Sequence, residues 1–362
     1  MRIGCRPALS SSFETHHCWN PMPRTKALSP FLLTASKDVM DLNAVSSDGI
    51  GSSTGVNTGA TTGIVSLPEE GQICSTDWEL DVYSRPVLVD GKKLWEVLIT
   101  DSTGSLKYVQ PLPSSSVNSK SVRTSIESLI TLCSTLSLPA PKQIRFFRGQ
   151  MYNMLNIALS EVDVVATPSR ATYSLKSWID QRESYVYPNM PDYQENLSAE
   201  ALRKAGRGFL DISSPVKLPD ALRGERYAFV SLPLSEFREG GGVTAENIGL
   251  GRLCPTENLD LPEDSFVSGV VVMSARAKGL AAWMAGTEIA CIRCDLRKRN
   301  MVMEADISTQ YLMARLDDGQ RKEGEAFEKA KEEMDGLHFL AVQEDEEDEE
   351  PKGFWLLKDV AD

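Results

Sequence analysis

Alternating apolar and polar residues predict a β-hairpin near residue 78. Residues 78–101 read WELDVYSRPVLVDGKKLWEVLITD, two apolar runs on either side of Asp90-Gly91. An Asp-Gly pair between such runs is a strong hairpin signal, because both residues tolerate positive φ. Pro86 has no amide hydrogen, so it predicts an edge position or a bulge in the first strand. A third strand is expected over Leu106–Gln110.

Helical periodicity then alternates with short strands. Val122, Ile126 and Leu129 are spaced as on one face of a helix, which Ser119 or Ser121 could cap. The next expected elements are a strand over Gln143–Phe147, a helix over Met151–Val162, a strand over Asp163–Ala166 and a helix carrying Leu175, Trp178 and Ile179. This order predicts an α/β domain on a mixed sheet, with a strand-helix order like that of the ribonuclease-H-like fold.

A second domain of the same class is expected after a Pro- and Gly-rich stretch. A new strand begins at RYAFVSLPL, and a buried strand, SFVSGVVVMS, precedes a helix of small residues, ARAKGLAAWMAG. A strand meander, a charged helix over 320–334 and two closing strands complete the pattern. The fold class is therefore α/β (α+β) with two mixed-sheet domains. The predicted boundaries are 1–72 for a transit peptide and disordered linker, 73–188 for the first domain, 189–224 for a linker and 225–362 for the second domain.

The first 37 residues have the composition of an organelle transit peptide. They contain five basic residues and many Ser and Thr, but Glu14 is their one acidic residue. Such acid-poor, hydroxyl-rich, Arg-bearing segments are typical of mitochondrial or chloroplast targeting. Residues 43–63 are rich in Gly, Ser and Thr and predict a linker. A merely disordered tail is the alternative interpretation.

Charge and cysteine content limit the kinds of ligand, membrane segment and metal site that the chain can have. The formal net charge is −13, but the run Glu344–Glu350 supplies seven negative charges and leaves −6 for the other residues. Any contact with nucleic acid would therefore have to come from local basic patches. No apolar run is long enough to span a membrane. Seven scattered cysteines do not suggest a disulfide framework, and the lone pair Cys291 and Cys294 fits a strand better than a zinc site.

Catalytic motifs are scarce. The three histidines are His16, His17 and His338, of which the first two fall in the expected transit peptide. His338 lies in an apolar strand, where a structural role fits better, so a histidine-based nucleophilic triad is nearly excluded. No phosphate-binding loop of the G-x-x-x-x-G-K-[ST] type occurs. We expect no enzymatic activity, no cofactor and no metal.

Several long blocks resemble the Tab-two family of chloroplast translation activators. Besides the opening hairpin they are IRFFRGQM, PSRATYSLKSWIDQRESYVYPNMPDY, LPDALRGERYAFVSLP, ARAKGLAAWMAGTEIA and the ending GLHFLAVQ with GFWLLKD. The resemblance implies an RNA-binding activator of translation in the chloroplast stroma. It implies as targets the plastid messengers for photosystem reaction-centre proteins, notably the B-type core protein of photosystem I, and action within a larger translation-related complex. Ala171 departs from the family pattern, which has a second Arg after PSR.

Three groups of residues are candidates for binding messenger RNA, because RNA is bound by stacking on aromatic or Arg planes and by charge on its phosphates. They are Arg145, Phe147 and Arg148; Arg170 and Arg182; and Arg293, Arg297, Lys298 and Arg299. For the first two groups the alternative is a buried environment with the arginines in ion pairs. For the third group the alternative is a solvated hairpin tip.

Two rival functions remain open. A protein–protein assembly factor for photosynthetic complexes, without direct RNA contact, would fit the low net charge. A metal-dependent nuclease would use carboxylates such as Asp81, Glu127 and either Asp180 or Glu183. Arg148 argues against the nuclease, since a cation at that place would repel a metal ion.

Overall fold

The computed structural model describes residues 63–69, 72–198, 201, 215–219, 222–256, 259, 261–348 and 350–359. All of them belong to one compact unit. The expected transit peptide and nearly all of the expected Gly/Ser/Thr linker lie outside the described residues. No described helix has the length and hydropathy that a membrane-spanning segment requires.

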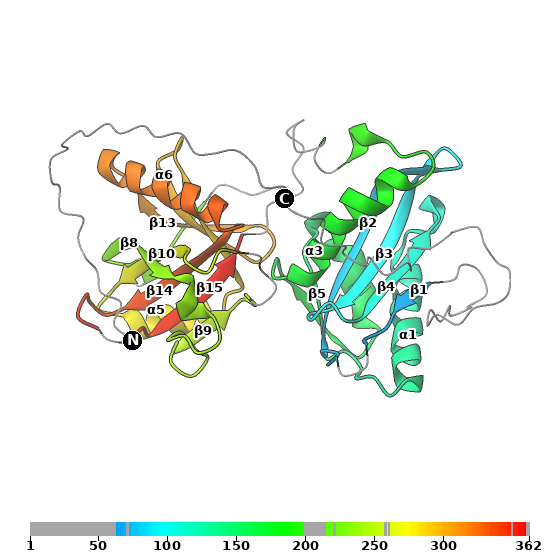
Figure 1. The fold of residues 1–362 in the computed structure, drawn as a ribbon, viewed down its shortest axis with the longest axis horizontal. Coiled ribbons are helices and arrows are strands. Elements are labelled where there is room, and N and C mark those ends of the chain that lie inside the picture. The colour runs from blue at the N-terminus through cyan, green and yellow to red at the C-terminus, as the bar shows by residue number, and fades with distance from the viewer. Residues whose placement is uncertain are drawn as a thin grey trace, which may run out of the picture. The chain divides into compact units, whose positions relative to one another are not determined.

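The first half of the described chain forms one six-stranded mixed sheet (Figure 1). Its strands are β1 (Ile64–Ser66), β2 (Asp77–Val89), β3 (Lys92–Asp101), β4 (Lys107–Leu112), β5 (Gln143–Phe146) and β6 (Val165–Pro168). Its helices are α1 (Ser119–Thr135), α2 (Tyr152–Ser160) and α3 (Tyr173–Gln181), and α3 continues into a π-helical turn, η3 (Arg182–Val186). Short 3-10 helices lie at Ser114–Ser116, Gly149–Met151, Tyr187–Asn189 and Glu195–Leu197.

The strand order β1-β4-β3-β2-β5-β6 confirms the predicted topology of this half. Strands β2, β3 and β4 form an antiparallel meander, whereas β5 and β6 run parallel to β2. A three-strand meander followed by two parallel strands on the outer side of its first strand is the ribonuclease-H-like arrangement. The hairpin turn lies at Asp90 and Gly91, both with positive φ, as the sequence predicts. The bulge predicted from Pro86 is present between Ser84 and Leu88.

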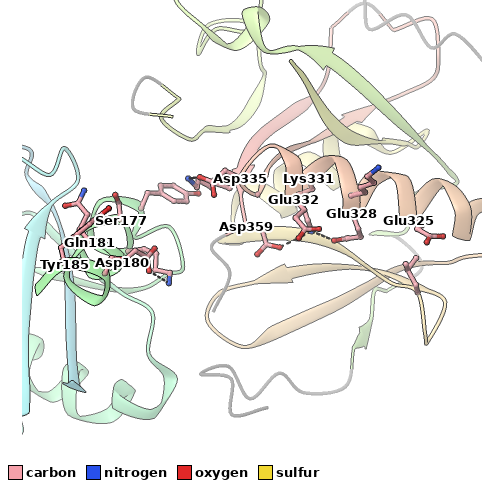
Figure 2. Close-up of a pocket in the computed structure, with 17 residues that line it drawn as sticks. Ser177, Asp180, Gln181, Tyr185, Glu325, Glu328, Lys331, Glu332, Asp335 and Asp359 are labelled. Atoms are coloured by element: carbon pink, nitrogen blue, oxygen red, sulfur yellow. Dashed lines mark hydrogen bonds and ion pairs between the residues drawn. The ribbon is translucent and has the colours of Figure 1, made fainter. Parts of the chain in front are cut away.

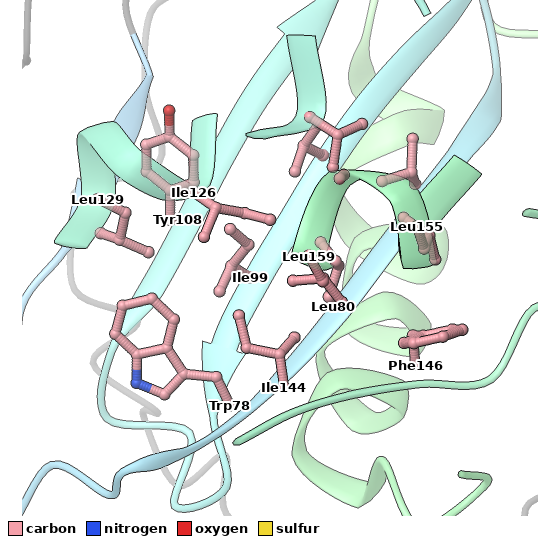
Figure 3. Close-up of a cluster of buried hydrophobic side chains, with 14 of the residues drawn as sticks. Trp78, Leu80, Ile99, Tyr108, Ile126, Leu129, Ile144, Phe146, Leu155 and Leu159 are labelled. Atoms are coloured by element: carbon pink, nitrogen blue, oxygen red, sulfur yellow. The ribbon is translucent and has the colours of Figure 1, made fainter. Parts of the chain in front are cut away.

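Helices cover both faces of this sheet. Side chains of α1 and α2 pack with Trp78, Leu80 and Ile99 in the larger core, which Figure 3 shows. On the opposite face, Trp178 and Ile179 of α3 pack with residues of β3 and β4. Removing this apolar surface from water is the main stabilising term of the half, at roughly 25 cal/mol per Å² buried.

Two local details differ from the sequence expectations. The N-cap of α1 is Asn118, whose side chain accepts a hydrogen bond from the amide of Ser121 at 3.0 Å, so neither Ser119 nor Ser121 is the cap. Asn and Ser are nearly equivalent caps, which is why the pattern alone could not separate them. Strand β1 lies upstream of the first strand expected and pairs with β4.

The second half contains two further mixed sheets. One is five-stranded, in the order β8 (Arg226–Pro233), β10 (Phe266–Met273), β14 (Leu337–Gln343), β15 (Gly353–Lys358) and β9 (Leu250–Leu253). The other is four-stranded, in the order β11 (Ile289–Asp295), β12 (Asn300–Ala305), β13 (Thr309–Arg315) and β7 (Val216–Lys217). The helices are α5 (Ala277–Ala285), α6 (Asp318–Glu333) and the 3-10 helix η7 (Leu234–Phe237). The mixed α/β class predicted from the sequence is thus confirmed.

Strand β9 was not predicted, because its sequence looks like a loop. Gly249 and Gly251 have φ of 66° and 146°, values that side chains with a Cβ rarely adopt. A Cβ on Gly251 would also collide with the backbone of Phe354 in the adjacent strand β15. The glycines therefore permit close pairing with β15 while removing the apolar alternation that marks a strand.

Side chains, not a further strand, satisfy the backbone at the edge of β11. The amide of Ile292 donates to Nε2 of His338 at 2.9 Å, and its carbonyl accepts from Nζ of Lys331 at 3.0 Å. The amide of Cys294 donates to Oε1 of Glu328 at 2.6 Å. Burial and the nearby charge of Lys331 lower the pKa of His338 to about 3, so the ring is a neutral acceptor. His338 thus has a structural role.

A buried carboxyl group of β2 satisfies the amino-terminal turn of α3. Oε2 of Glu79 accepts a hydrogen bond from the amide of Leu175 at 2.6 Å. Glu79 is buried, with 2% of its surface exposed to solvent. Burial raises the pKa of Glu79 to about 8, although the Leu175 amide acts in the opposite direction. The folded protein therefore takes up a proton at Glu79 that the unfolded chain releases near its ordinary pKa.

We expect this proton to make stability fall as pH rises. Because the folded pKa lies above the unfolded one, the free energy of unfolding should decrease between roughly pH 5 and pH 8, by up to about 1.4 kcal/mol per pH unit. Glu79→Gln keeps the acceptor for Leu175 and removes the ionisation, so its stability should lack this part of the slope. Urea denaturation at several pH values measures it, with the exposed Glu127→Gln as a control. Equal slopes for Glu79→Gln and the unmodified protein would contradict the assignment.

Candidate nucleic-acid interface

Arg148, which follows β5, is bound to a buried carboxylate of β2. Its Nε and Nη2 donate to the two oxygens of Asp81 at 2.5 and 3.1 Å. Its guanidinium also lies 3.9 Å from the ring centre of Tyr83 and 4.8 Å from that of Phe147. A bidentate pair with aromatic rings beside it holds a guanidinium in one orientation. The charge of Arg148 and the face of its guanidinium are therefore used in contacts inside the domain.

The same buried network extends through two more arginines. Arg85 bonds Asp81 at 3.0 Å and approaches Glu96 at 3.2 Å. Glu96 also accepts from Nη2 of Arg182 at 2.7 Å and from the hydroxyl of Tyr187 at 2.6 Å. Burial alone would raise the pKa of Asp81, but Arg148 and Arg85 outweigh it and lower that pKa. Asp81 thus remains ionised because guanidinium groups surround it.

Arg145 connects the first half of the chain to the second. Its Nε donates to Asp77 and its Nη1 to Oε1 of Glu288, both at 3.0 Å. Glu288 also accepts from Ser169 and Arg252. As the alternation of β5 predicts, Arg145 projects from the face opposite the buried residues of that strand.

Arg170 and Arg293 share a second carboxylate, Glu304 of β12. Nη2 of Arg170 lies 2.6 Å from Oε2 of Glu304, and Nε of Arg293 lies 3.2 Å from Oε1. Arg293 also binds Asp359, which Lys331 approaches at 3.2 Å. At the position where the sequence departs from the family pattern, the amide of Ala171 donates to the hydroxyl of Ser169. Of these contacts, the Arg170–Glu304 pair again joins segments of the two halves.

The hairpin tip between β11 and β12 is the one predicted group whose charges face solvent. Asp295 accepts from the amides of Arg297 and Lys298 and so folds the turn, and Arg299 has a φ of 56°. The side chains of Lys298 and Arg299 are 68% and 52% exposed, even though they form surface ion pairs with Asp295 and Asp318. Exposed pairs of this kind contribute little energy and exchange readily with other anions.

Arg315 adds a cation that sequence reasoning missed. It ends β13, is exposed, and stands opposite Asn300 in the register of β12 and β13. It therefore lies beside the hairpin tip, although 16 residues separate it from Arg299 along the chain. Only the strand register reveals this neighbour, so no local motif could have indicated it.

The residues suggested for a nuclease do not come together. Asp81 is occupied by arginines, Glu127 lies on the exposed side of α1 next to Arg123, and Asp180 bonds Lys176. The structure, as far as it is described, contains no group of three His, Cys, Asp or Glu residues placed to hold a metal ion. The arrangement thus gives no support to a metal-dependent nuclease.

Cys291 and Cys294 do not form a thiol pair. Cys294 lies in the core beside Gly324 of α6, whereas Sγ of Cys291 lies 3.4 Å from Oε2 of Glu304. Residues three apart on a strand project to opposite faces, so the two sulfur atoms point away from each other. Burial raises the pKa of the Cys294 thiol to about 12, which keeps it protonated.

A cleft of about 900 Å³ has an acidic lining (Figure 2). Residues of α3 and its continuation form one part of it, including Asp180 and Tyr185, and residues of α6 form another, including Glu325, Glu328 and Glu332. Its lysines are engaged by carboxylates: Lys176 by Asp180, Lys329 by Glu333, Lys331 by Glu328 and Asp359, and Lys358 by Asp335. Such a lining repels phosphate groups, so this cleft does not suit RNA.

Comparison with known families matches both halves of the chain. Residues 77–182 match the amino-terminal domain described as "RNA-binding protein Tab2/Atab2 N terminal", and residues 207–358 match "RNA-binding protein Tab2/Atab2, C-terminal domain". The chain belongs to the Tab2/Atab2 family. The Tab2/Atab2 domains thus include the buried arginine network, the contacts between the halves and the hairpin tip.

Two plant relatives extend this result. "Protein TAB2 homolog, chloroplastic" from Zea mays is 36% identical over 298 residues, which cover 78% of this chain and 72% of the relative. The protein of the same name from Arabidopsis thaliana is 35% identical over 298 residues, covering 81% and 77%. The Tab2/Atab2 resemblance seen in the sequence is therefore confirmed over most of the chain.

Similarity to solved structures is weak. The magnesium complex of the HTLV-2 integrase catalytic core domain matches with a TM-score of 0.23 and 16% identity, covering 37% of this chain and 84% of that one. A simian T-cell lymphotropic virus intasome matches with a TM-score of 0.25 and 13% identity, covering 45% and 65%. Scores this low support no inference, and the ribonuclease-H-like topology of this Tab2/Atab2 member is identified from its own strand order.

The arginine network predicts a large loss of stability when one guanidinium is removed. In Arg148→Met, Asp81 keeps a buried charge with less compensation, so the free energy of unfolding should fall by about 3–5 kcal/mol. Urea denaturation at neutral pH measures this loss. The double variant Asp81→Asn with Arg148→Met should recover part of it, and Lys298→Met at the exposed tip should change stability by less than about 0.5 kcal/mol. A loss as small as that of Lys298→Met would refute the importance of the pair.

Proposed function

We propose that this protein is an RNA-binding activator of translation in the chloroplast stroma. The observation that carries the proposal is the match of both halves to domains described as RNA-binding, in the same order and over most of the folded chain. The names of the two plant relatives, both chloroplastic, support the location. The acid-poor amino-terminal segment adds to this support, since its composition is typical of a transit peptide.

The messengers we propose as targets encode photosystem reaction-centre proteins, with the B-type core protein of photosystem I as the first candidate. Activation of translation requires binding and positioning rather than bond cleavage. The ion pairs that occupy Asp81 and Glu96 fit a non-enzymatic role, because arginines engage both oxygens of each carboxylate. Photosystem biogenesis is then the process that the protein serves.

The RNA-contacting surface we propose is the basic hairpin tip, made of Arg297, Lys298, Arg299 and the neighbouring Arg315. Flexible, exposed cations suit phosphates, since they can exchange a surface carboxylate for an RNA phosphate at little energetic cost. For the other predicted residues we propose a positioning role, because their guanidinium groups bind buried or half-buried carboxylates within the first sheet, within the second half or between the two halves. These residues are Arg145, Arg148, Arg170, Arg182 and Arg293, and Phe147 stacks beside Arg148.

A protein–protein assembly factor remains the rival proposal. The acidic cleft favours it, because a concave surface that repels phosphate suits a basic protein segment. An RNA-binding protein should bind RNA with an affinity that falls with salt, whereas an assembly factor should not bind RNA. One binding experiment therefore separates the two proposals.

The proposal is tested by binding the full-length chain to a plastid photosystem messenger leader and to an unrelated RNA of equal length, over a salt series. We expect tighter binding to the leader and an affinity that falls steeply with salt. Replacing Arg297, Lys298 and Arg299 together by Gln should weaken binding at least about tenfold and reduce the slope of log affinity against log salt by about 2, since each phosphate contact contributes about 0.7.

The control is Lys92→Gln with Lys93→Gln, which removes charge from the exposed start of β3. This variant should bind as the unmodified protein does. Absence of binding to either RNA would favour the assembly factor. Equal losses in both variants would show that net charge, rather than the β11–β12 tip, governs RNA binding.

A further inference from the structure

A second basic surface lies where the parallel strands β10 and β14 both end. The amide of Ser274, just after β10, donates to the carbonyl of Gln343, the last residue of β14, at 3.0 Å. The chain then enters α5 after β10 and the acidic run after β14. In open α/β sheets, ligands bind outside the carboxyl ends of parallel strands, where helix amino termini point at them.

Three cations converge on this end of the sheet. Arg226 begins β8 opposite Met273 of β10, and its side chain is 59% exposed. Lys278 is exposed in the first turn of α5, and Lys352 directly precedes β15. The first turn of α5 contains no acidic residue, although just before it the amide of Ala275 donates to the carboxylate of Glu225 at 2.7 Å. The basic character of this surface therefore comes from the three side chains.

The acidic loop, described over residues 344–348 and 350, contacts two of these cations. Oε1 of Glu346 accepts from Arg226 at 2.7 Å, and Oδ1 of Asp348 accepts from Lys352 at 2.9 Å. Burial opposes ionisation of Asp348, but Lys352, a backbone amide and, at longer range, Lys278 outweigh it and lower its pKa. An internal anion thus sits on the basic surface.

The loop carries more negative charge than its contacts use. Asp345 and Glu347 are exposed and form no ion pair with any residue that the structure describes. Asp348 also accepts from the amide of Glu344 at 3.1 Å, so it holds the shape of the loop as well as binding Lys352. A closely spaced row of carboxylates on a basic surface has the charge pattern of a short stretch of phosphate backbone.

We propose that the surface formed by Arg226, Lys278 and Lys352 binds phosphates of RNA, and that the acidic loop is an internal competitor that occupies it. This inference rests on the proposed RNA-binding function and adds to it a second contact region and a control on access. The Arg226–Glu346 pair is largely exposed, so the loop-bound and loop-released forms of this surface differ little in energy. RNA can therefore displace the loop. Displacement is favoured further because it leaves the acidic loop free in solvent while RNA releases its counterions.

The test neutralises the loop without unfolding it. In the loop variant, Glu344, Glu346, Glu347 and Glu350 become Gln and Asp345 becomes Asn, while Asp348 is kept. Against the leader RNA at about 100 mM salt, the full-length variant should bind about tenfold tighter than the unmodified protein, with a steeper salt slope. No gain in affinity would overturn the proposal.

A combined variant separates competition from long-range repulsion. It adds Arg226→Gln and Lys278→Gln to the loop variant, and the gain should then disappear. If the gain persists, the loop acts by its net charge alone and the proposal is wrong. Thermal unfolding of each variant shows that any loss of binding comes from a folded protein.

Inorganic polyphosphate serves as a probe that does not depend on the messenger. The loop variant should bind it more tightly than the unmodified protein, and the combined variant should not. If polyphosphate shows this pattern while no protein binds the leader RNA, the proposed function fails but the competition between loop and anion stands. If polyphosphate binds all three proteins equally, the basic surface is not the loop's target.

Discussion

The structure depends on the rule that a guanidinium removed from water needs a carboxylate. Arg148 with Asp81, Arg145 with Glu288 and Arg170 with Glu304 each obey it, and each pair joins segments far apart in sequence. A buried ion pair contributes little net stability compared with apolar packing, but a broken one is costly. These pairs therefore favour one arrangement of sheets and exclude others. Their directional bonds specify how β5, β6 and the residues that follow them meet the rest of the chain.

The need to pair each buried guanidinium explains why basic residues in the sequence blocks shared with the family need not contact a ligand. The most conspicuous arginines of the sequence lie in the interior, whereas the cations free to exchange partners lie on the β11–β12 tip and around the start of α5. Charge on this acidic protein is thus divided into two populations. Buried charges are neutralised locally and shape the fold, and exposed charges create short-range fields that salt screens within about 10 Å.

The sequence predicted nearly every long element, because alternation and helical spacing record which faces are buried. It found the hairpin at Asp90-Gly91 from turn chemistry and the first sheet's topology from element order. It missed β9, where Gly251 is required by a neighbouring backbone, since a glycine leaves no hydropathy signal. It also could not distinguish an arginine on a binding surface from one in a buried pair. That difference depends on partners such as Glu288 and Glu304, more than a hundred residues away from Arg145 and Arg170.

The edge of β11 has a consequence for how the protein avoids aggregation. An open strand edge can template pairing with another chain. Here the amide and carbonyl groups of Ile292 and the amide of Cys294 are taken up by His338, Lys331 and Glu328, which come from β14 and α6. Those elements are synthesised after β11, so the backbone groups at this edge stay unpaired until the last part of the chain has docked. A nascent or truncated chain that lacks α6 and β14 is accordingly the form most exposed to self-association and most dependent on chaperones.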